Sequence, residues 1–360
     1  MGGAVFGYLG DRLGRKSALV ATLLIMGLST MLIGLLPSYD QIGIAAPLIL
    51  TGLRFLQGLG VGGEWGGAVL LALEYSHRGR RGFFASWPQT GVPLGLLLST
   101  AVVAWLQGIM SEEDFFAWGW RIPFLLSGVL IVVGFIIRAR VLETPLFREL
   151  QASKQLSQAP IRETLRLHWR EVLLAAGTRI GENACFYLFS VYVIKYADND
   201  RLMEADVLHA IQLAALLDFL AIPLFGMLSD FWSRRGMYMT GCLLLMAVAF
   251  PYFMLLETRQ PALVTVAVVL SFVAGHAILI AVQGAMIPEL FGTRLRYTGA
   301  SLGCQLAAPL GGGPAPIIAA SLAQFFPGQY WPLAMYVIVV AGVSLGSVYC
   351  LAETSRKDLD

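Results

Sequence analysis

Long runs of apolar residues, separated by short polar segments, follow one another along the whole chain. Each run reaches the roughly 20 mainly apolar residues that a helix needs to cross the hydrocarbon core of a membrane. Glycine and proline are frequent inside the runs, as they are in membrane helices, and the alternating pattern of a membrane-barrel strand is missing. The pattern predicts ten full spans, at Ser17–Leu36, Pro47–Tyr75, Phe83–Ile109, Ile122–Ile137, Val172–Tyr196, Val207–Met227, Met237–Leu256, Pro261–Ile287, Tyr297–Phe325 and Trp331–Leu351.

Composition agrees with this pattern. Of the 360 residues, 57% are hydrophobic and only 13% are charged, whereas soluble domains carry about 25% charged residues. The chain is therefore predicted to be an all-α polytopic membrane protein, and a soluble globular domain is excluded.

Lysine and arginine are distributed unevenly over the loops. When the spans are threaded in order, most of the 25 basic residues fall on the side that holds the long polar segment from Arg138 to Arg170. Basic residues mark the cytoplasmic side of a membrane protein. We therefore predict a multi-pass protein of the cell (inner) membrane whose central loop and C-terminus are cytoplasmic. The basic loops report topology and do not indicate a nucleic-acid partner.

The sequence offers no pattern for a metal or a cofactor. Its four cysteines stand singly in apolar runs, where a small buried hydrophobic residue is the usual role. Its four histidines do not cluster, and the HExxH spacing of zinc enzymes is missing. We predict no cofactor, no metal and no enzymatic activity.

The second part of the chain repeats motifs of the first part in the same order. Tandem repeats around a central loop are typical of secondary transporters, whose substrate site lies between the halves. The paired positions differ by 219, 215 and 216 residues. The first motif, Gly-x-Leu-x-Asp before two basic residues, begins at Gly7 and at Gly226. The second, Glu with Arg seven positions later, begins at Glu74 and at Glu289. The third, Gln-x-x-x-Pro-Leu-Gly, begins at Gln89 and at Gln305.

The repeat also predicts the domain organisation. We expect an N-terminal helical bundle at 1–138, a central cytoplasmic loop at 139–170 and a C-terminal helical bundle at 171–360. In the second half two spans precede the motif at Gly226, whereas only six residues precede the motif at Gly7. By this internal comparison we expect the first bundle to lack its first helix and most of its second.

The repeated motifs resemble the major facilitator superfamily, and more closely its metabolite:proton symporter branch. The motifs that carry the resemblance are Gly7–Lys16, Arg54–Gly58, Gly62–Gly67 and Pro288–Gly299. Around Trp118–Phe124 and Gly311–Gly313 the sequence is most similar to the shikimate-permease-like members of that branch. The resemblance implies the major facilitator fold, two pseudo-symmetric helical bundles, here with about ten full spans and part of helix 2.

The sequence departs from the family pattern in two places. The second charged turn has Phe231, Trp232 and Ser233 where the family has an arginine and a glycine. The acidic and aromatic positions of the family's first helix have no counterpart here. The second departure leaves open a truncated relative without transport activity.

Polar residues inside the spans are the candidates for binding and coupling, because ionisable groups in a membrane are costly and are therefore functional by default. For a carboxylate-bearing substrate we predict Arg54 and Arg179, since arginine binds a carboxylate with two parallel hydrogen bonds. The predicted substrate-binding set is Arg54, Gln57, Arg179, Asn183, Tyr187 and Gln283.

Carboxylates and a histidine inside the spans are the candidates for carrying a proton, and they are Glu64, Glu182, Asp218 and His276. Burial among the surrounding glycines favours a protonatable Glu64, and a structural ion pair explains that residue equally well. Glu182 follows Arg179 at i+3, so the two either compensate one another or form a pair that protonation opens. Asp218 is expected to be a proton site or a partner of Arg179, and a lone His276 is more often a hydrogen-bonded core residue.

The charged turns are predicted to be gates. Rocking of two halves needs contacts that break and form again, and the resemblance implies this role for both copies of the turn. The predicted gating residues are Gly7, Asp11, Arg12, Gly14, Arg15, Lys16, Gly226, Asp230, Arg234 and Arg235.

Together these features predict a proton-coupled symporter of a small anionic metabolite, shikimate-like or another carboxylate. Its partners are the metabolite, protons and the lipid bilayer, and it is expected to act as a monomer. The alternatives are a family member without transport activity and uptake of a zwitterion such as proline or betaine.

Overall fold

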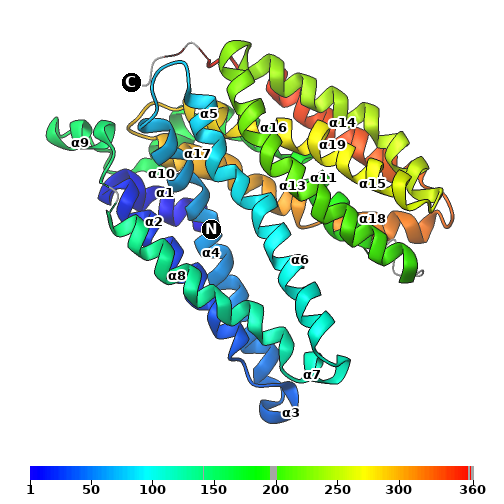
Figure 1. Ribbon diagram of the computed structural model, residues 1–360. Coiled ribbons are helices and arrows are strands. Elements are labelled where there is room, and N and C mark those ends of the chain that lie inside the picture. Colours follow the sequence, from blue (N-terminus) through cyan, green and yellow to red (C-terminus); the bar gives the residue numbers. More distant parts are fainter. Residues whose placement is uncertain (141, 195–200, 356, 358–360) are drawn as a thin grey trace.

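The computed structural model describes residues 1–140, 142–194, 201–355 and 357, and within these ranges it contains helices and no strand (Figure 1). The first half consists of α1 (Gly2–Leu13), α2 (Arg15–Gly34), α3 (Tyr39–Ile42), α4 (Ala45–Glu74), α5 (Arg81–Ser86), the 3₁₀ segment η1 (Trp87–Thr90), α6 (Gly91–Ile109), α7 (Glu112–Ala117), the 3₁₀ turn η2 (Gly119–Arg121) and α8 (Ile122–Arg140).

Two short helices, α9 (Pro145–Ala152) and α10 (Pro160–Leu167), connect the halves. The second half consists of α11 (Trp169–Tyr187), η3 (Leu188–Tyr192), α13 (Arg201–Phe231), α14 (Arg234–Glu257), α15 (Pro261–Leu270), η4 (Ser271–His276), α16 (Ala277–Glu289), α17 (Arg296–Ala307), η5 (Ala308–Gly312), α18 (Ala315–Phe325) and α19 (Trp331–Tyr349). The segments η3, η4 and η5 are single π-helical turns inside longer helices.

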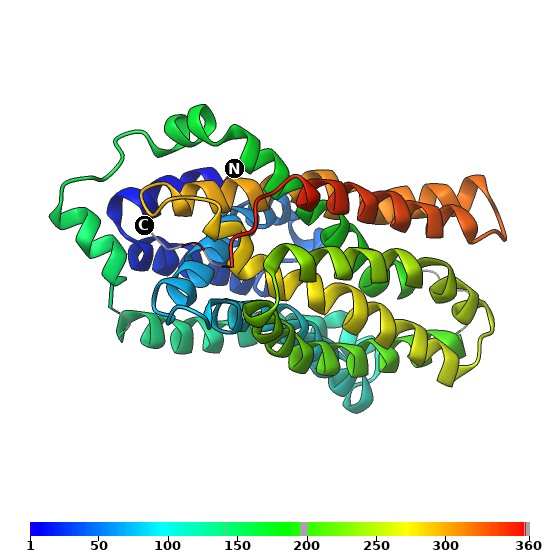
Figure 2. The same cartoon turned by 90° about the horizontal axis from the view of Figure 1, so that it is seen from above.

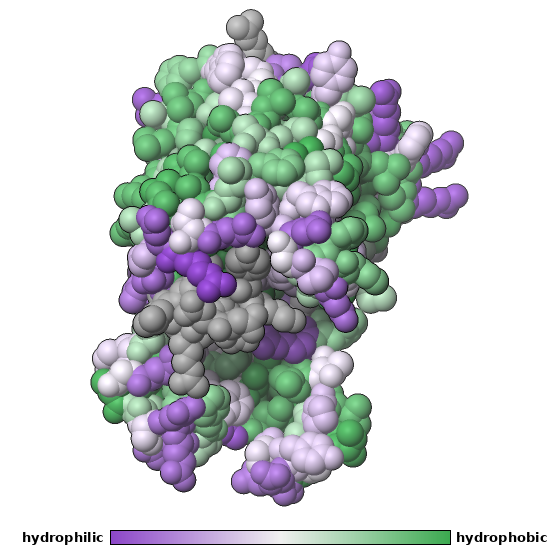
Figure 3. Space-filling model, turned by 90° about the vertical axis from the view of Figure 1, so that its right-hand side faces the viewer, coloured by the Kyte–Doolittle hydropathy of each residue, from purple (hydrophilic) through white to green (hydrophobic). Residues whose placement is uncertain are grey.

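Nine helices of the described ranges are long and apolar enough to cross a membrane. They correspond to nine of the ten predicted spans. The remaining one, Val172–Tyr196, begins as α11, but that helix carries Arg170, Glu171, Arg179 and Glu182 and is too polar to be counted by composition. The predicted end of this span at Tyr196 lies outside the described residues. Hydrophobic side chains predominate over the upper part of the face that Figure 3 presents, and hydrophilic ones gather at its middle and lower end.

The helices form two bundles that lie side by side (Figure 1). In the first bundle α2 packs against α4 and α8, and in the second α11 and α14 pack against α19. The bundles meet where α1 contacts α17 and where α5 and α6 contact α13. Seen from above in Figure 2, the segment with α9 and α10 runs along the outer edge of the molecule, and α10 contacts α1, α11 and α17. The bundles are therefore joined at the end that carries the charged turns.

At the opposite end the molecule is open. Figure 1 shows the two bundles diverging from the end with the charged turns, with α3 and α7 of the first bundle far from α15 and α18 of the second. One pair of repeat positions shows that the two bundles differ in helix packing. A Cβ on Gly311 of η5 would lie 2.7 Å from the backbone oxygen of Ile180 in α11, whereas a Cβ on its repeat counterpart, Gly95 of α6, would meet nothing within 4 Å. The described residues thus place no helix against this face of α6.

Candidate functional site

A chain of ionisable side chains is buried inside the second bundle. Arg179 Nε lies 3.5 Å from Glu182 Oε2 on the same helix, α11. The other Glu182 oxygen lies 3.5 Å from His276 Nε2 of η4, and His276 Nδ1 lies 2.9 Å from Asp218 Oδ2 of α13. Three helices therefore bring four sequence-predicted residues into one cluster, which we call the polar cluster.

Helix geometry and packing explain this arrangement. Arg179 and Glu182 lie three residues apart and therefore share one face of α11. The ring of Phe186, one turn further on, packs 4.9 Å from the imidazole of His276. Asp218 is fully buried, and Glu182 and His276 are 3% exposed, so each needs a charged or hydrogen-bonding partner. The partner of Asp218 is His276, and Arg179 pairs with Glu182 instead.

Gln283 extends the polar cluster by neutral hydrogen bonds. Its Nε2 donates to the Tyr238 hydroxyl at 2.7 Å, and that hydroxyl donates to the Thr178 carbonyl at 2.6 Å. Thr178 directly precedes Arg179, so Gln283 is connected to the start of the ion-pair chain. Tyr238, on α14, was not among the sequence-predicted residues.

Asn183 and Tyr187 lie on the part of α11 that faces η5. A Cβ on Gly312 would lie 2.9 Å from the Tyr187 ring and 3.5 Å from Asn183 Cβ. The Tyr187 side chain is 41% exposed. These two predicted residues therefore border the polar cluster at the α11–η5 contact rather than belonging to its ion pairs.

One aromatic side chain of the first half reaches the polar cluster. The Arg179 guanidinium carbon lies 5.1 Å from the centre of the Trp65 ring of α4. The Trp65 indole nitrogen donates to Gln89 Oε1 of η1 at 2.9 Å. Trp65 and Gln89 were not predicted as site residues, and the contact of Trp65 with Arg179 crosses from one half to the other.

Arg54 and Gln57 lie elsewhere on α4. Arg54 Nη1 donates to Gln57 Oε1 at 3.0 Å, and Gln57 Nε2 donates to the Thr30 hydroxyl of α2 at 2.6 Å. Arg54 is exposed and precedes Trp65 by eleven residues, which is about 16 Å along a helix axis. The structure therefore separates the two predicted substrate-binding arginines.

Glu64 pairs with Arg138 of α8. The same guanidinium donates to the Leu19 carbonyl of α2 at 3.0 Å, so the ion pair joins three helices of the first bundle. Glu64 thus has a partner that the sequence did not reveal, 74 residues away.

The first charged turn fastens the first half to the second. Asp11 accepts hydrogen bonds from the backbone nitrogens of Tyr297, at 3.3 Å, and Thr298, at 2.9 Å, at the start of α17. Arg15 lies 2.8 Å from Asp11 and donates to the Thr293 carbonyl at 2.9 Å. A carboxylate at a helix N-terminus is favoured by the unpaired N–H groups and the helix dipole. We call this contact the first latch.

The second charged turn makes the reciprocal contact. Asp230 accepts from the backbone nitrogens of Gly82, at 2.7 Å, and Phe83, at 2.9 Å, at the start of α5. Arg234 lies 2.7 Å from Asp230 and 3.4 Å from Glu289. This second latch has the same layout as the first, with the two halves exchanged.

Close helix contact at the latches requires glycine. A Cβ on Gly7 would lie 2.9 Å from Thr298 Cα, and one on Gly226 would lie 2.6 Å from the Gly82 carbonyl oxygen. Gly14, which separates α1 from α2, has a φ of +113°, a value that L side chains rarely adopt.

The remaining three predicted gating residues, Arg12, Lys16 and Arg235, have contacts of other kinds. Arg12 hydrogen-bonds Tyr8 on its own helix. The Arg235 guanidinium lies 4.9 Å from the centre of the Tyr349 ring. The Lys16 backbone donates to Glu143.

Each latch includes acidic residues that were not predicted as gating residues. Glu143 accepts from the backbone nitrogens of Arg15 and Lys16 at 3.1 and 3.2 Å, and Glu353 accepts from those of Arg234 and Arg235 at 3.0 and 3.2 Å. A Glu-Thr pair after the last span of each half is the sequence signal that could have identified them.

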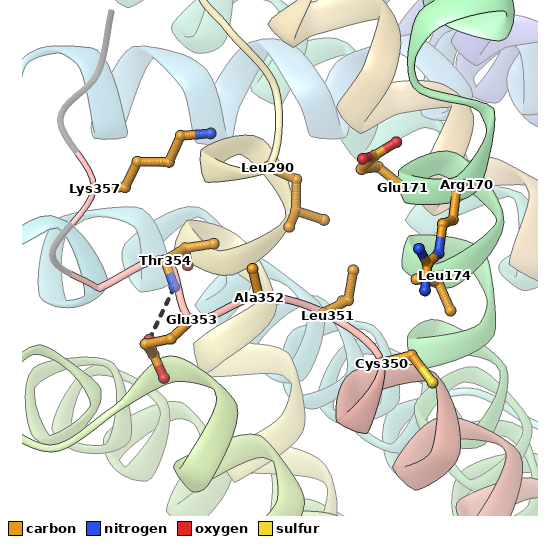
Figure 4. A pocket seen from close by; sticks show the side chains of 10 residues that line it. All are labelled: Arg170, Glu171, Leu174, Leu290, Cys350, Leu351, Ala352, Glu353, Thr354 and Lys357. Atoms are coloured by element: carbon orange, nitrogen blue, oxygen red, sulfur yellow. Dashed lines mark hydrogen bonds between the residues drawn. The ribbon is translucent and has the colours of Figure 1, made fainter.

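Glu353 belongs to a C-terminal segment that crosses one side of a cavity of about 290 Å³, opposite Arg170 and Glu171 of α11 (Figure 4). Burial by itself would raise the pKa of Glu353, but hydrogen bonds from Ser233, Ser355 and the Arg235 backbone lower this pKa to about 2. Thr354 donates to Glu289 at 2.7 Å, which ties the segment to the second latch.

Comparison with known proteins agrees with this architecture. Residues 1–308 match the sequence profile of the Major Facilitator Superfamily. The chain is 37% identical to the shikimate transporter of Escherichia coli over 99% of its length and 82% of that protein. It is 33% identical to the proline/betaine transporter of Salmonella typhimurium over its whole length and 73% of that protein.

Solved structures show the same fold. The proton:xylose symporter XylE bound to 6-bromo-6-deoxy-D-glucose superposes with a TM-score of 0.79 at 14% identity, over 99% of this chain and 84% of that one. With its apolar helices and metabolite-transporting relatives, the protein is a multi-pass inner-membrane transporter of metabolites and not an enzyme. The chain belongs to the major facilitator superfamily.

Proposed function

We propose that this transporter couples proton movement to symport of a small anionic metabolite, a shikimate-like compound or another carboxylate. The observation that carries the proposal is the polar cluster, in which Arg179, Glu182, His276 and Asp218 form one buried chain. Buried ionisable groups in a membrane protein mark substrate and proton pathways. The 37% identity to a shikimate transporter supports the substrate class.

Arg179 is the residue that binds the carboxylate in this proposal. Its buried Nη1 atom makes no hydrogen bond with any described residue, and its Nε atom has only the 3.5 Å ion pair with Glu182. A guanidinium with unused N–H groups is suited to two parallel hydrogen bonds to a carboxylate. Arg54, exposed on α4 and held by Gln57, is a second anion-binding position on the way from the open end.

Glu182 and His276 carry the proton. Glu182 lies between Arg179 and His276, so a proton on its carboxylate weakens the ion pair and leaves Arg179 available to an anionic substrate. His276 connects Glu182 to Asp218 and supplies a second place for the proton. Loading of proton and substrate together then neutralises the added charge. Glu64 stays a candidate, although its ion pair with Arg138 gives it a structural partner.

The latches act as the gate. We assign the latched end to the cytoplasm, from the basic loops, and the open end to the outside. Bundles 1–138 and 171–360 rock about the site, and both latches break when the cytoplasmic end opens. The structure then corresponds to the state that receives substrate from outside.

Uptake into proteoliposomes tests the proposal. Labelled shikimate is presented with and without an inward proton gradient, and with a protonophore. We expect gradient-driven uptake that the protonophore abolishes and that Arg179→Ala reduces at least a hundredfold. Arg170→Ala, an exposed arginine on the same helix, serves as the control and retains uptake. Uptake that ignores the gradient refutes proton coupling, and full uptake by Arg179→Ala refutes the site.

Uptake of a zwitterion is the second candidate function, favoured by the 33% identity to a proline/betaine transporter. Competition by unlabelled proline and betaine in the same assay separates the two. No uptake of any of these solutes by correctly folded protein favours a family member without transport activity.

A further inference from the structure

Several buried polar atoms around the polar cluster have no hydrogen-bond partner among the described residues. They come from both halves of the molecule, and they are Nε2 of Gln89, Oε1 of Gln283 and Nη1 of Arg179. Nε of Arg179 and Oε2 of Glu182 also lack a hydrogen bond, but they face one another at 3.5 Å in their ion pair. Gln89 is 2% exposed and Gln283 is fully buried. Buried polar groups are nearly always hydrogen-bonded, so unused atoms gathered in one region point to a ligand that completes them.

The orientation of each glutamine amide follows from its neighbours. An indole N–H only donates, so the Gln89 atom that faces Trp65 must be the oxygen, and the NH₂ group is left unused. The Thr178 carbonyl only accepts, so Tyr238 uses its hydroxyl proton there and must accept from Gln283. The unused atom of Gln283 is therefore its oxygen. Gln89 offers donors to a ligand, and Gln283 offers an acceptor.

Trp65 places the donor of Gln89 close to that of Arg179. Its indole nitrogen holds Gln89 at 2.9 Å, and its ring face lies 5.1 Å from the Arg179 guanidinium carbon. Gln89, through its oxygen, and Arg179, through its guanidinium, therefore contact the same Trp65 side chain from opposite halves of the protein. An acceptor with negative charge satisfies both at once, and the acceptor on Gln283 requires a separate O–H or N–H group.

We propose that the substrate is a hydroxylated carboxylic acid whose carboxylate lies between Arg179 and Gln89 and whose hydroxyl group donates to Gln283. Trp65 is the positioning residue that fixes both donors. This inference rests on the proposed function and narrows its substrate class. Betaine fits poorly, because it has no hydrogen-bond donor for Gln283, and the ring face of Trp65 that a quaternary ammonium would use is occupied by Arg179.

Binding to the full chain in lipid nanodiscs tests the inference without requiring transport. The probes are shikimate, its deoxy analogue cyclohex-1-ene-1-carboxylate, betaine and proline. We expect the wild type to bind shikimate at least about tenfold more tightly than the deoxy analogue, the cost of a buried acceptor left unpaired. Gln283→Leu should remove this preference while leaving affinity for the deoxy analogue within about twofold.

Gln89→Glu tests the carboxylate position. It keeps an oxygen for the Trp65 indole but replaces the donor group with a negative one, so affinity for both carboxylates should fall at least about tenfold. Gln305→Glu, the same change at the repeat counterpart in α17, is the matched control and should change affinity less than twofold. If Gln89→Glu is not monodisperse, Gln89→Met removes the donor without adding charge and is expected to show the same loss.

The outcomes separate the two levels of the proposal. If wild-type protein binds neither carboxylate, or binds only betaine or proline, the proposed function fails and the inference with it. If it binds shikimate but Gln89→Glu and Gln283→Leu leave the affinities and their ratio unchanged, the inference fails and the proposed function stands.

Discussion

The substitution Asp11→Asn, which replaces one carboxylate oxygen with an NH₂ group, is expected to weaken the first latch. In Asp11→Asn the side chain keeps one oxygen for the start of α17, but it loses the charge that faces Arg15 and one of the two oxygens that accept from backbone N–H groups. The wild-type carboxylate accepts from Thr298 N at 2.9 Å and from Tyr297 N at 3.3 Å, and lies 2.8 Å from Arg15. We expect the substitution to weaken the contact between the halves and to favour opening at the latched end.

The magnitude follows from the interactions that are lost. Hydrogen bonds to a charged group contribute about 1.5–3 kcal/mol each. Loss of one hydrogen bond from a backbone N–H and of the charge-assisted bond from Arg15 therefore removes about 3 kcal/mol from the closed state. Each 1.4 kcal/mol is a factor of ten in an equilibrium constant, so the open fraction should rise about a hundredfold.

Hydrogen–deuterium exchange measures this opening at the amides themselves. In the closed state the Tyr297 and Thr298 amides are bonded to Asp11, so their exchange in Asp11→Asn should be about a hundred times faster than in the wild type. The amides of Gly82 and Phe83 at the second latch should also exchange faster, because both latches release when the halves part. Unchanged exchange at Tyr297 and Thr298 would refute the latch. Faster exchange there with no change at the second latch would show local fraying in place of gate opening.

Three further predictions follow from contacts elsewhere. Gly10→Ala should favour the open state in the same exchange measurement, because its Cβ would lie 1.9 Å from the Tyr297 ring, and normal exchange would mean that the ring moves aside without cost. Glu64→Gln and Arg138→Met should each lower the free energy of unfolding by about 1–3 kcal/mol, since each leaves a partly buried charge unpaired. The double variant should recover part of this loss, and strictly additive losses would show that the two side chains do not stabilise one another. The pKa of Glu353 is lowered from 4.5 to about 2, so the stabilisation that its charge contributes is present above about pH 4.5 and is lost as pH falls toward about 2. The melting temperature of the wild type should therefore fall more steeply than that of Glu353→Gln over this pH range. Parallel melting profiles of the two proteins would contradict this prediction.

The sequence was enough to predict the membrane architecture and to mark two equivalent charged turns, whose role as gates stays a prediction. Apolar runs of sufficient length have few alternatives in a membrane, and the repeat at Asp11 and Asp230 marked two equivalent positions before any contact was known. The spacing of Arg179 and Glu182 on one helix also predicted their pairing. These inferences depend on local periodicity or on internal repetition, which a single sequence contains.

Partners on different helices could not be predicted. His276 and Asp218 are separated by 58 residues, and Arg138 and Glu64 by 74. One sequence carries no information on which helices become neighbours, so Asp218 was left with two possible roles. Glu143 and Glu353 differ by 210 residues, somewhat less than the other repeat pairs, so their Glu-Thr pairs do not share the spacing of the repeated motifs.

The three π-helical turns give the two halves different mechanical properties. All three π-turns of the described chain lie in the second half, at Leu188–Tyr192, Ser271–His276 and Ala308–Gly312. A π-turn interrupts the regular backbone ladder and is a preferred point for a helix to bend. One of them contains His276, one follows α11 directly and the third is η5 itself, so bending would move His276 relative to Arg179. The second half therefore has three π-turns at which its helices can bend, whereas the interruption in the first half is the 3₁₀ segment η1 within the α5–α6 span, so the two halves of this pseudo-symmetric protein bend at different depths.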